Sequence, residues 1–209
     1  MHELLDDPHF KRTASALTET VRFLAARGWT PATSSNFSAR IPHRGELIAI
    51  SRSGVDKSLF CEEDVMVVDM AGKSVAPEGA RPSAETLLHT LLYESSNVGA
   101  VLHTHSVGGT VCSMQYAKRG SIEFRGYEIL KGLAGNQSHE ATEILPIFPN
   151  DQDMAALSRQ VGDYWKHHRN IHGFLIEGHG LYTWGMDLAS AKRHVETFEF
   201  LFECLLKTR

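Results

Sequence analysis

The sequence predicts one α/β domain with a largely antiparallel sheet, and three observations lead to this fold class. Helical and β-type hydrophobic patterns alternate along the chain. Two segments, EDVMVVDMAGKSV (63–75) and GFLIEGHGLYTWG (173–185), place short apolar runs on either side of a glycine-containing turn, the pattern of a hairpin. The length of 209 residues and an apolar content of 42% suit a single domain, residues 1–209, with its own core.

The first half of the chain is predicted to begin with a helix over residues 8–27, where apolar residues recur at helical spacing before the capping Gly28. A connection rich in Thr, Ser and Asn follows, TPATSSNFSAR (30–40), before a predicted strand ELIAIS (46–51). A second helix is predicted from Pro82-Ser83 to about residue 93, with Ser83 as its N-cap. Its buried face would contain Leu87, Leu88, Leu91 and Leu92.

The second half continues with a strand, GAVLHTHS (99–106), and a helical stretch that follows the glycine-rich VGGT. Residues 146–149, PIFP, are predicted as an extended loop, and residues 153–168 as a helix. A last helix begins near Asp187. One face of it would contain Leu188, Ala191, Val195, Phe198 and Phe202.

Composition excludes several classes of protein. The net charge is −4 and no block of Lys or Arg stands out, which argues against nucleic-acid binding. The apolar stretches are far shorter than the roughly 20 residues of a membrane helix, and MHELLDDPHF does not resemble a signal peptide. Three cysteines without a CxxC pair indicate reduced thiols. We therefore expect a cytoplasmic protein with no nucleic-acid or membrane partner.

Three histidines out of twelve form a candidate metal site. His103 and His105 are two apart on a predicted strand, so both side chains point to the same face. His179 lies between two glycines, which allow another group to approach closely. Three imidazoles with open positions suit zinc or a similar divalent ion that polarises a carbonyl oxygen as a Lewis acid. The alternatives are surface histidines at a strand end and a tight turn at GHG.

Two glutamates are candidate acid/base groups. Glu85 lies in the first turn of the second helix, where it could stabilise the helix dipole, ligate a metal or act as a general base. His89, four residues later, could face the same site or form a helix-surface pair with Glu85. Glu128, in RGYEILKG, has the sequence context of an ordinary surface glutamate.

Three short stretches rich in hydroxyls and small residues could bind an anion: SSNFS (34–38), SRSG (51–54) and RPSA (81–84). Helix N-termini with a Ser cap bind phosphate, and glycine lets the backbone approach an anion. None of the stretches matches a P-loop or a dinucleotide fingerprint, which disfavours nucleotides. Together with the histidines, they predict a small phosphorylated substrate.

The ordered set SNFS, SGxxK, PSAE, HTHS and GHG followed by WG resembles the class II aldolase/adducin family, over about residues 10 to 206. The resemblance implies a three-layer α/β/α fold and a homotetramer with active sites at subunit interfaces. It implies one Zn²⁺ per subunit, held by His103, His105 and His179. It also implies a substrate phosphate pocket formed by Asn36, Ser53, Gly54 and Ser83.

Within the family, GYEILKG (126–132) and HGLYTWG (179–185) look most like the dehydratases that act on a phosphorylated methylthio sugar in methionine salvage. This implies a hydro-lyase with Glu128 as its catalytic acid/base. Glu85 matches the glutamate that serves the family's aldolases as metal ligand and base, and it is the second candidate for the proton transfer.

Two rival functions remain open. A sugar-phosphate aldolase or a pentulose-phosphate 4-epimerase of the same family would share the zinc and phosphate motifs. The chain ends at Lys207-Thr208-Arg209 without the tyrosine-bearing tail of such aldolases, which tilts the expectation toward the dehydratase. A non-enzymatic adducin-like domain, which has lost the metal ligands, is disfavoured because all three histidines and both glutamates are present.

Overall fold

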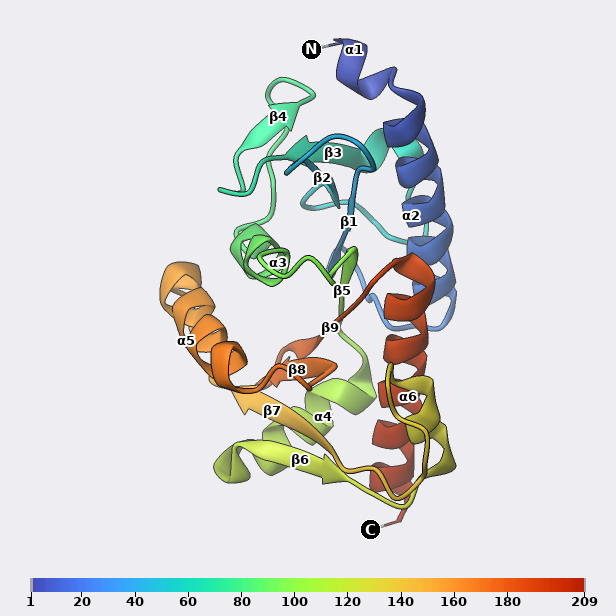
Figure 1. Cartoon of the computed structure of the whole chain (residues 1–209), viewed down its shortest axis with the longest axis vertical. Helices are drawn as coiled ribbons and strands as arrows, with labels where there is room; N and C mark the ends of the chain where they lie inside the picture. The colour runs from blue at the N-terminus through green and yellow to red at the C-terminus, as the bar shows by residue number, and fades with distance from the viewer. Residues whose placement is uncertain (1, 209) are drawn as a thin grey trace.

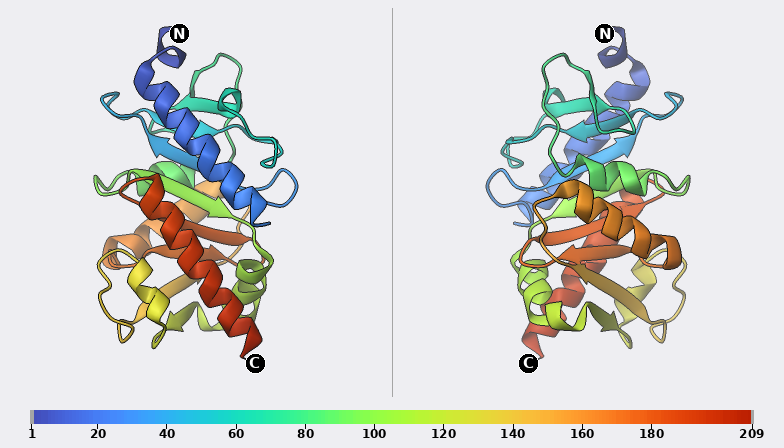
Figure 2. Two further views of the ribbon diagram at one scale, coloured as in Figure 1. Left: turned by 90° about the vertical axis from the view of Figure 1, so that its right-hand side faces the viewer. Right: turned by 90° about the vertical axis from the view of Figure 1, so that its left-hand side faces the viewer.

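A nine-stranded mixed sheet forms the centre of the protein, seen in a computed structural model that describes residues 2–208 (Figure 1). The strand order is β4-β3-β2-β1-β5-β9-β8-β7-β6. Neighbouring strands pair antiparallel except for β7 and β8, which are parallel. Helices α2 and α6 cover one face of the sheet, and α3 and α5 cover the other (Figure 2). The predicted α/β class with three layers and a largely antiparallel sheet is therefore confirmed.

The elements have the following bounds. The strands are β1 (Asn36–Arg40), β2 (Ile48–Ser51), β3 (Val65–Val68), β4 (Ser74–Ala76), β5 (Ala100–Thr104), β6 (Ser121–Phe124), β7 (Glu143–Phe148), β8 (Gly173–Ile176) and β9 (Gly180–Gly185). The α-helices are α1 (His2–Leu5), α2 (Pro8–Ala26), α3 (Thr86–Leu92), α4 (Val107–Tyr116), α5 (Met154–His167) and α6 (Leu188–Lys207). Three 3₁₀ turns, η1 (Glu62–Asp64), η2 (Ala117–Arg119) and η3 (Glu128–Gly132), complete the set.

The long helices begin where the sequence carries capping residues. Asp7 accepts a hydrogen bond from the backbone N–H of His9 at the start of α2, Asp153 caps α5 and Asp187 caps α6. Such caps satisfy backbone N–H groups that have no partner within the helix. Between residues 2 and 208, none of the helices has the length and apolar character needed to cross a bilayer.

Two strands were missed in the sequence. The stretch predicted as a connection contains β1, which pairs with both β2 and β5 near the middle of the sheet. Its polar residues Asn36 and Ser38 hide the β pattern because they are buried against other polar groups. The predicted loop around Pro146 is part of β7. Pro146 lies opposite Ser121 of β6, and the next residue, Ile147, donates to the carbonyl of Gly120, so the pairing of β7 with the β6 segment continues past the proline.

The second predicted helix is shorter than expected. Helix α3 begins at Thr86, and the cap position is Glu85 rather than Ser83. The hydroxyl of Ser83 instead accepts a hydrogen bond from the backbone N–H of Glu85. The buried face also differs, because His89 and two threonines lie inward while Leu87 and Leu91 are only half-buried. This polar inner face meets β1, where Asn36 and Ser38 point toward it.

Strand register brings the polar centre together. Asn36 of β1 lies opposite His103 of β5, and His103 lies opposite Tyr182 of β9. Directly opposite residues share one face of a sheet. His179 precedes β9 in the turn after β8, and its backbone N–H donates to the carbonyl of Ile176. The hairpin 173–185 predicted from the sequence is thus the element that places His179 beside β5.

Gly180→Ala is expected to lower the free energy of unfolding by about 1–3 kcal/mol, the usual cost of overpacking. A Cβ at this position would lie 2.1 Å from the carbonyl oxygen of Thr104 and 3.1 Å from Cε1 of His103. Because the first contact is with backbone, β9 would have to move away from β5. Urea unfolding measures the effect, and Gly162→Ala in α5 is the control because its Cβ would meet the flexible end of Leu91. Equal unfolding midpoints for the two variants would contradict the prediction.

Candidate active site

The three histidines predicted as metal ligands lie together on the side of the sheet covered by α3 and α5. One ligand atom from each of His103, His105 and His179 falls within 4.8 Å of the other two. The Nε2 atoms of His103 and His105 are 2.7 Å apart, and those of His103 and His179 are 3.2 Å apart. Tetrahedral zinc with three imidazole ligands requires nitrogen–nitrogen separations of roughly 3.3 Å. The three nitrogens thus lie close enough together to hold one metal ion.

The protonation of His103 also suits a cation. Its Nδ1 lies 2.9 Å from the carbonyl oxygen of Leu181, to which it can only donate, so Nε2 presents a lone pair to the cluster. This backbone contact is the usual support for a metal-bound histidine. Its ring stacks on Tyr182 with centroids 3.9 Å apart. Burial lowers the pKa of His103 well below its ordinary value, and burial likewise lowers the pKa of His105 to about 4. Both rings are neutral, as metal ligands must be.

Glu85 completes the cluster. Its Oε1 lies 3.0 Å from Nε2 of His179, and its Oε2 lies 3.6 Å from Nε2 of His103. The Tyr182 hydroxyl and the Asn36 amide both donate to Oε2. Burial acts to raise the pKa of Glu85, but the hydrogen bonds that His179 and Asn36 donate to the carboxylate outweigh it and hold that pKa well below its usual range. The carboxylate is therefore an anion directed at the triad.

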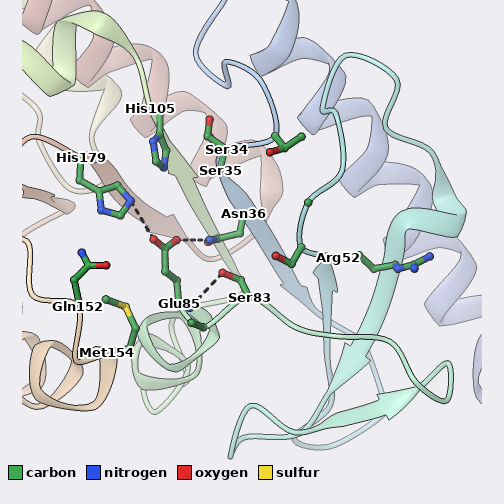
Figure 3. A pocket seen from close by; sticks show the side chains of 14 residues that line it. Ser34, Ser35, Asn36, Arg52, Ser83, Glu85, His105, Gln152, Met154 and His179 are labelled. Atoms are coloured by element: carbon green, nitrogen blue, oxygen red, sulfur yellow. Dashed lines mark hydrogen bonds and ion pairs between the residues drawn. The ribbon is translucent and has the colours of Figure 1, made fainter.

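A pocket of about 370 Å³ opens in front of this cluster (Figure 3). The hydroxyl-rich stretches of the sequence meet here, although they come from three separate segments of the chain. All four residues expected to bind phosphate line it, together with Glu85, His105 and His179. The four are Asn36, Ser53, Gly54 and Ser83. Ser34, Ser35 and Arg52 extend the same polar wall, whereas Met154 and Gln152 form the opposite side.

A buried lysine behind this wall was not identified from the sequence. Lys57, the last residue of the SGxxK motif, is fully buried, and its Nζ donates to the carbonyl oxygens of Val55 and Thr33, at 2.8 and 3.4 Å. Burial lowers the pKa of Lys57. Because these two carbonyls belong to the two loops that form the polar wall, Lys57 joins the loops and adds positive charge behind them. The signal in the sequence was the motif itself, which indicated a turn.

Glu128 lies outside the pocket of its own chain. It begins η3 in the connection between β6 and β7, and its side chain is 72% exposed. Its carboxylate pairs with Lys131 and lies 3.9 Å from Nδ1 of His139. The pKa of Glu128 is lowered by the hydrogen bond from Lys131. In one chain, then, the structure brings Glu85 to the histidines and leaves Glu128 on the surface.

Acidification is expected to destabilise the protein between pH 6.5 and pH 4. Burial lowers the pKa values of His89 and His194 to about 4 each. Below pH 6.5 the two imidazoles become protonated in the unfolded chain but stay neutral in the folded protein. The free energy of unfolding therefore falls by up to about 1.4 kcal/mol per pH unit for each ring. Urea unfolding at pH 7.5, 6.5 and 5.5 measures the slope, which should be smaller in His194→Gln. If the unfolding free energy of His194→Gln depends on pH as steeply as that of the unaltered protein, His194 does not contribute to the pH dependence.

Comparison with known proteins agrees with this geometry. The sequence pattern of the Class II Aldolase and Adducin N-terminal domain matches residues 15–206. The chain is 51% identical to the methylthioribulose-1-phosphate dehydratase of Stenotrophomonas maltophilia, over 98% of this chain and 94% of that protein. It is 48% identical to the protein of the same name from Marinobacter nauticus, over 98% of each chain.

Solved structures share the fold at lower identity. The l-fuculose-1-phosphate aldolase of Thermus thermophilus superimposes with a TM-score of 0.74 at 24% identity, over 96% of each chain. A sugar-phosphate aldolase from Thermotoga maritima superimposes with a TM-score of 0.71 at 18% identity, over 95% of each chain. At these identities the likeness establishes the fold alone.

Proposed function

The chain belongs to the class II aldolase and adducin family, and on that premise we propose that it is a hydro-lyase acting on 5-methylthioribulose 1-phosphate. The product is 2,3-diketo-5-methylthiopentyl 1-phosphate plus water, a step of methionine salvage in the cytoplasm. This is the activity named in relatives about half identical to the chain over nearly its whole length. The observation that carries the proposal is the histidine cluster with Glu85 in front of a hydroxyl-lined pocket.

His103, His105 and His179 would hold one Zn²⁺ per subunit: Nε2 of His103 presents a free lone pair, and Nε2 of His179 would bind the ion after giving up the proton that it directs at Glu85. Bound there, zinc supplies a Lewis acid that polarises the C2 carbonyl of the substrate and makes the C3 proton more acidic. Glu85 faces the same position, either as a further ligand or as a base. The spacing of the three nitrogens and the donation from His103 Nδ1 to the backbone support this assignment.

The proton transfers are assigned to Glu128. A carboxylate near C3 takes the C3 proton, the C4–OH bond breaks as the C3–C4 double bond forms, and the resulting acid protonates the departing hydroxyl. The enol left at C3 then becomes the second ketone, with two hydrogens on C4. Because Glu128 is exposed and outside the pocket of its own chain, we propose that it enters the pocket of a neighbouring subunit. A homotetramer with active sites at subunit interfaces would bring the two together.

The polar wall of the pocket would bind the phosphate of the substrate. Ser53, Ser83 and the backbone at Gly54 would present donors to one region of the pocket, and the Asn36 amide lines the same pocket. Lys57 lies behind these loops, where its Nζ donates to backbone carbonyls, and its positive charge would help to offset the negative charge of a phosphate. We further propose that residues 1–209 form a single domain.

The proposal is tested by mixing the purified protein with methylthioribulose 1-phosphate, with and without a chelator, and following diketone formation. Chelator-sensitive product is expected. No product from zinc-loaded protein would overturn the dehydratase assignment. In that case the protein is incubated with dihydroxyacetone phosphate and an aldehyde. Formation of a condensation product would support the aldolase alternative, because only an aldolase forms a carbon–carbon bond.

A further inference from the structure

A chain of buried polar side chains runs from the interior of the sheet to Glu85. The hydroxyl oxygens of Tyr93 and Ser38 are 2.9 Å apart, and Ser38 Oγ lies 2.7 Å from Nδ1 of His89. Nε2 of His89 bonds Oδ1 of Asn36, whose Nδ2 bonds Oε2 of Glu85. We call Tyr93, Ser38, His89 and Asn36 the Tyr93 relay. It links α3 to β1, two elements that are not consecutive in the sequence.

The chemistry of the last link fixes the direction of every hydrogen bond in the relay. Asn36 donates its NH₂ group to Oε2 of Glu85, the same oxygen that accepts from the Tyr182 hydroxyl, and presents its carbonyl oxygen to His89. That oxygen also only accepts, so His89 must carry its proton on Nε2 and accept at Nδ1. Ser38 then donates to His89 and accepts from Tyr93. All four donors point toward Glu85, an arrangement in which hydrogen bonds strengthen one another.

Because the relay is buried, its side chains must satisfy one another's hydrogen bonds. Ser38 and His89 are fully buried, and Asn36 and Tyr93 are 5% and 2% exposed. Burial lowers the pKa of His89 to about 4, so the ring is neutral in the relevant pH range and has one proton to place. A buried polar group that loses its partner costs about 1–3 kcal/mol. A relay of four such groups is therefore retained only with every partner in place.

We propose that Tyr93, Ser38 and His89 are positioning residues that act on Glu85 through Asn36. An asparagine side chain can turn over by 180°, which exchanges its oxygen and its nitrogen. Turned over, Asn36 would direct its oxygen at the Glu85 carboxylate and repel it. The His89 N–H opposes this state, because a turned-over Asn36 would require His89 to change tautomer and the Ser38 and Tyr93 hydroxyls to reverse as well. With Asn36 and Tyr182 both bonded to Oε2, the remaining oxygen, Oε1, faces His179.

This inference rests on the proposed function for its kinetic test. His89→Leu, which keeps the bulk but neither nitrogen, is expected to lower kcat about 10- to 100-fold, with KM changed by less than about threefold. His89→Gln can still accept from Ser38 and donate to Asn36, and it should recover most of the loss. Tyr93→Phe removes one oxygen and should lower kcat severalfold. Thr90→Val is the matched control, because Thr90 is a buried hydroxyl of the same helix that bonds only the carbonyl of Leu87.

The kinetic outcomes separate positioning from general damage to the fold. A fall in kcat that His89→Gln restores supports the relay. Equal kcat values for His89→Leu and Thr90→Val would overturn it. A His89→Leu variant in which KM changes while kcat does not would overturn it as well. Tyr93→Phe keeps the test decisive if His89→Leu does not fold, since the variant retains the ring that lies against Arg40.

A second measurement does not depend on turnover. The direction of the relay requires the neutral Nε2–H tautomer of His89, which long-range ¹⁵N–¹H spectra of histidine-labelled protein distinguish from Nδ1–H. The His89 resonances are assigned by their loss in His89→Gln. An Nδ1–H tautomer would overturn the relay even in an active enzyme. Absence of turnover together with the Nε2–H tautomer would overturn the proposed function and leave the relay intact.

Discussion

Glu128→Gln is expected to lower turnover by about 10²- to 10⁴-fold, the range of general acid–base catalysis, while zinc content stays unchanged. The amide keeps the shape of the side chain but can neither take the C3 proton nor return one to the leaving hydroxyl. Because Glu128 is 72% exposed and its partner is Lys131 on the same turn, stability should be nearly unaffected. Near-normal turnover would remove Glu128 from the mechanism.

The measurement is the steady-state rate of diketone formation, with zinc content determined on the same samples. Glu140→Gln is the matched control, because Glu140 is an exposed carboxylate in the same connection between β6 and β7. If Glu140→Gln lowers turnover as much as Glu128→Gln does, the loss reflects the removal of any negative charge from this connection and not a specific role of Glu128.

Mixing subunits tests whether Glu128 acts on a neighbouring chain. Glu128→Gln and His179→Ala proteins are each expected to be inactive, but hybrids of the two contain some sites that combine an intact triad with an intact Glu128 from the other chain. Activity should therefore reappear after the two proteins are dissociated and reassembled together. Recovery in the mixture and none in either protein treated alone is the expected pattern. No recovery from a verified hybrid would place Glu128 within its own subunit or outside catalysis.

His105→Gln is expected to weaken zinc binding by more than about 100-fold and to abolish detectable turnover at ordinary zinc concentrations. Only two of the three clustered imidazoles, those of His103 and His179, would remain to bind the ion. In the unaltered protein, zinc at 100 times its Kd should add about 2.7 kcal/mol of stability, which corresponds to a rise in Tm of roughly 5–10 °C for a chain of this size. The variant should show almost no rise.

Thermal unfolding after exhaustive chelation, with and without added zinc, measures this difference. His167→Gln is the control, because His167 is exposed at the end of α5 and is not one of the three clustered histidines. An equal zinc-dependent rise in Tm for His105→Gln and the unaltered protein would exclude His105 as a ligand.

The sequence predicted the parts of the fold whose signals are local. Aspartates before α2 and α6, and glycines around the β8–β9 turn, mark elements through contacts a few residues away. Strand β1 was missed because Asn36 and Ser38 have a polar pattern that only distant partners explain: His89 is 51 positions from Ser38. Strand β7 was not predicted because Pro146 lacks the backbone N–H that strand pairing normally uses.

The candidate site was predicted unevenly for the same reason. The histidines of HTHS and GHG could be paired because strand alternation and glycine spacing are local properties. Glu85 and His89 stayed open between a surface pair and a site role, since their burial depends on how α3 lies on β1. Lys57 was overlooked because only the meeting of two loops encloses it.

The register of β1 carries a consequence for folding accuracy. Asn36 and Ser38 alternate with Phe37 and Ala39, which lie in the apolar cluster beneath α2. A slip of one residue would exchange the two faces of the strand. Phe37 would then take the place of a polar group beside His103, and one amide and one hydroxyl side chain would enter an apolar layer without partners. The alternation of polar and apolar residues in β1 thus also favours the correct strand pairing, because a chain that misaligns β1 buries polar groups without partners and is expected to be less stable than the correctly paired one.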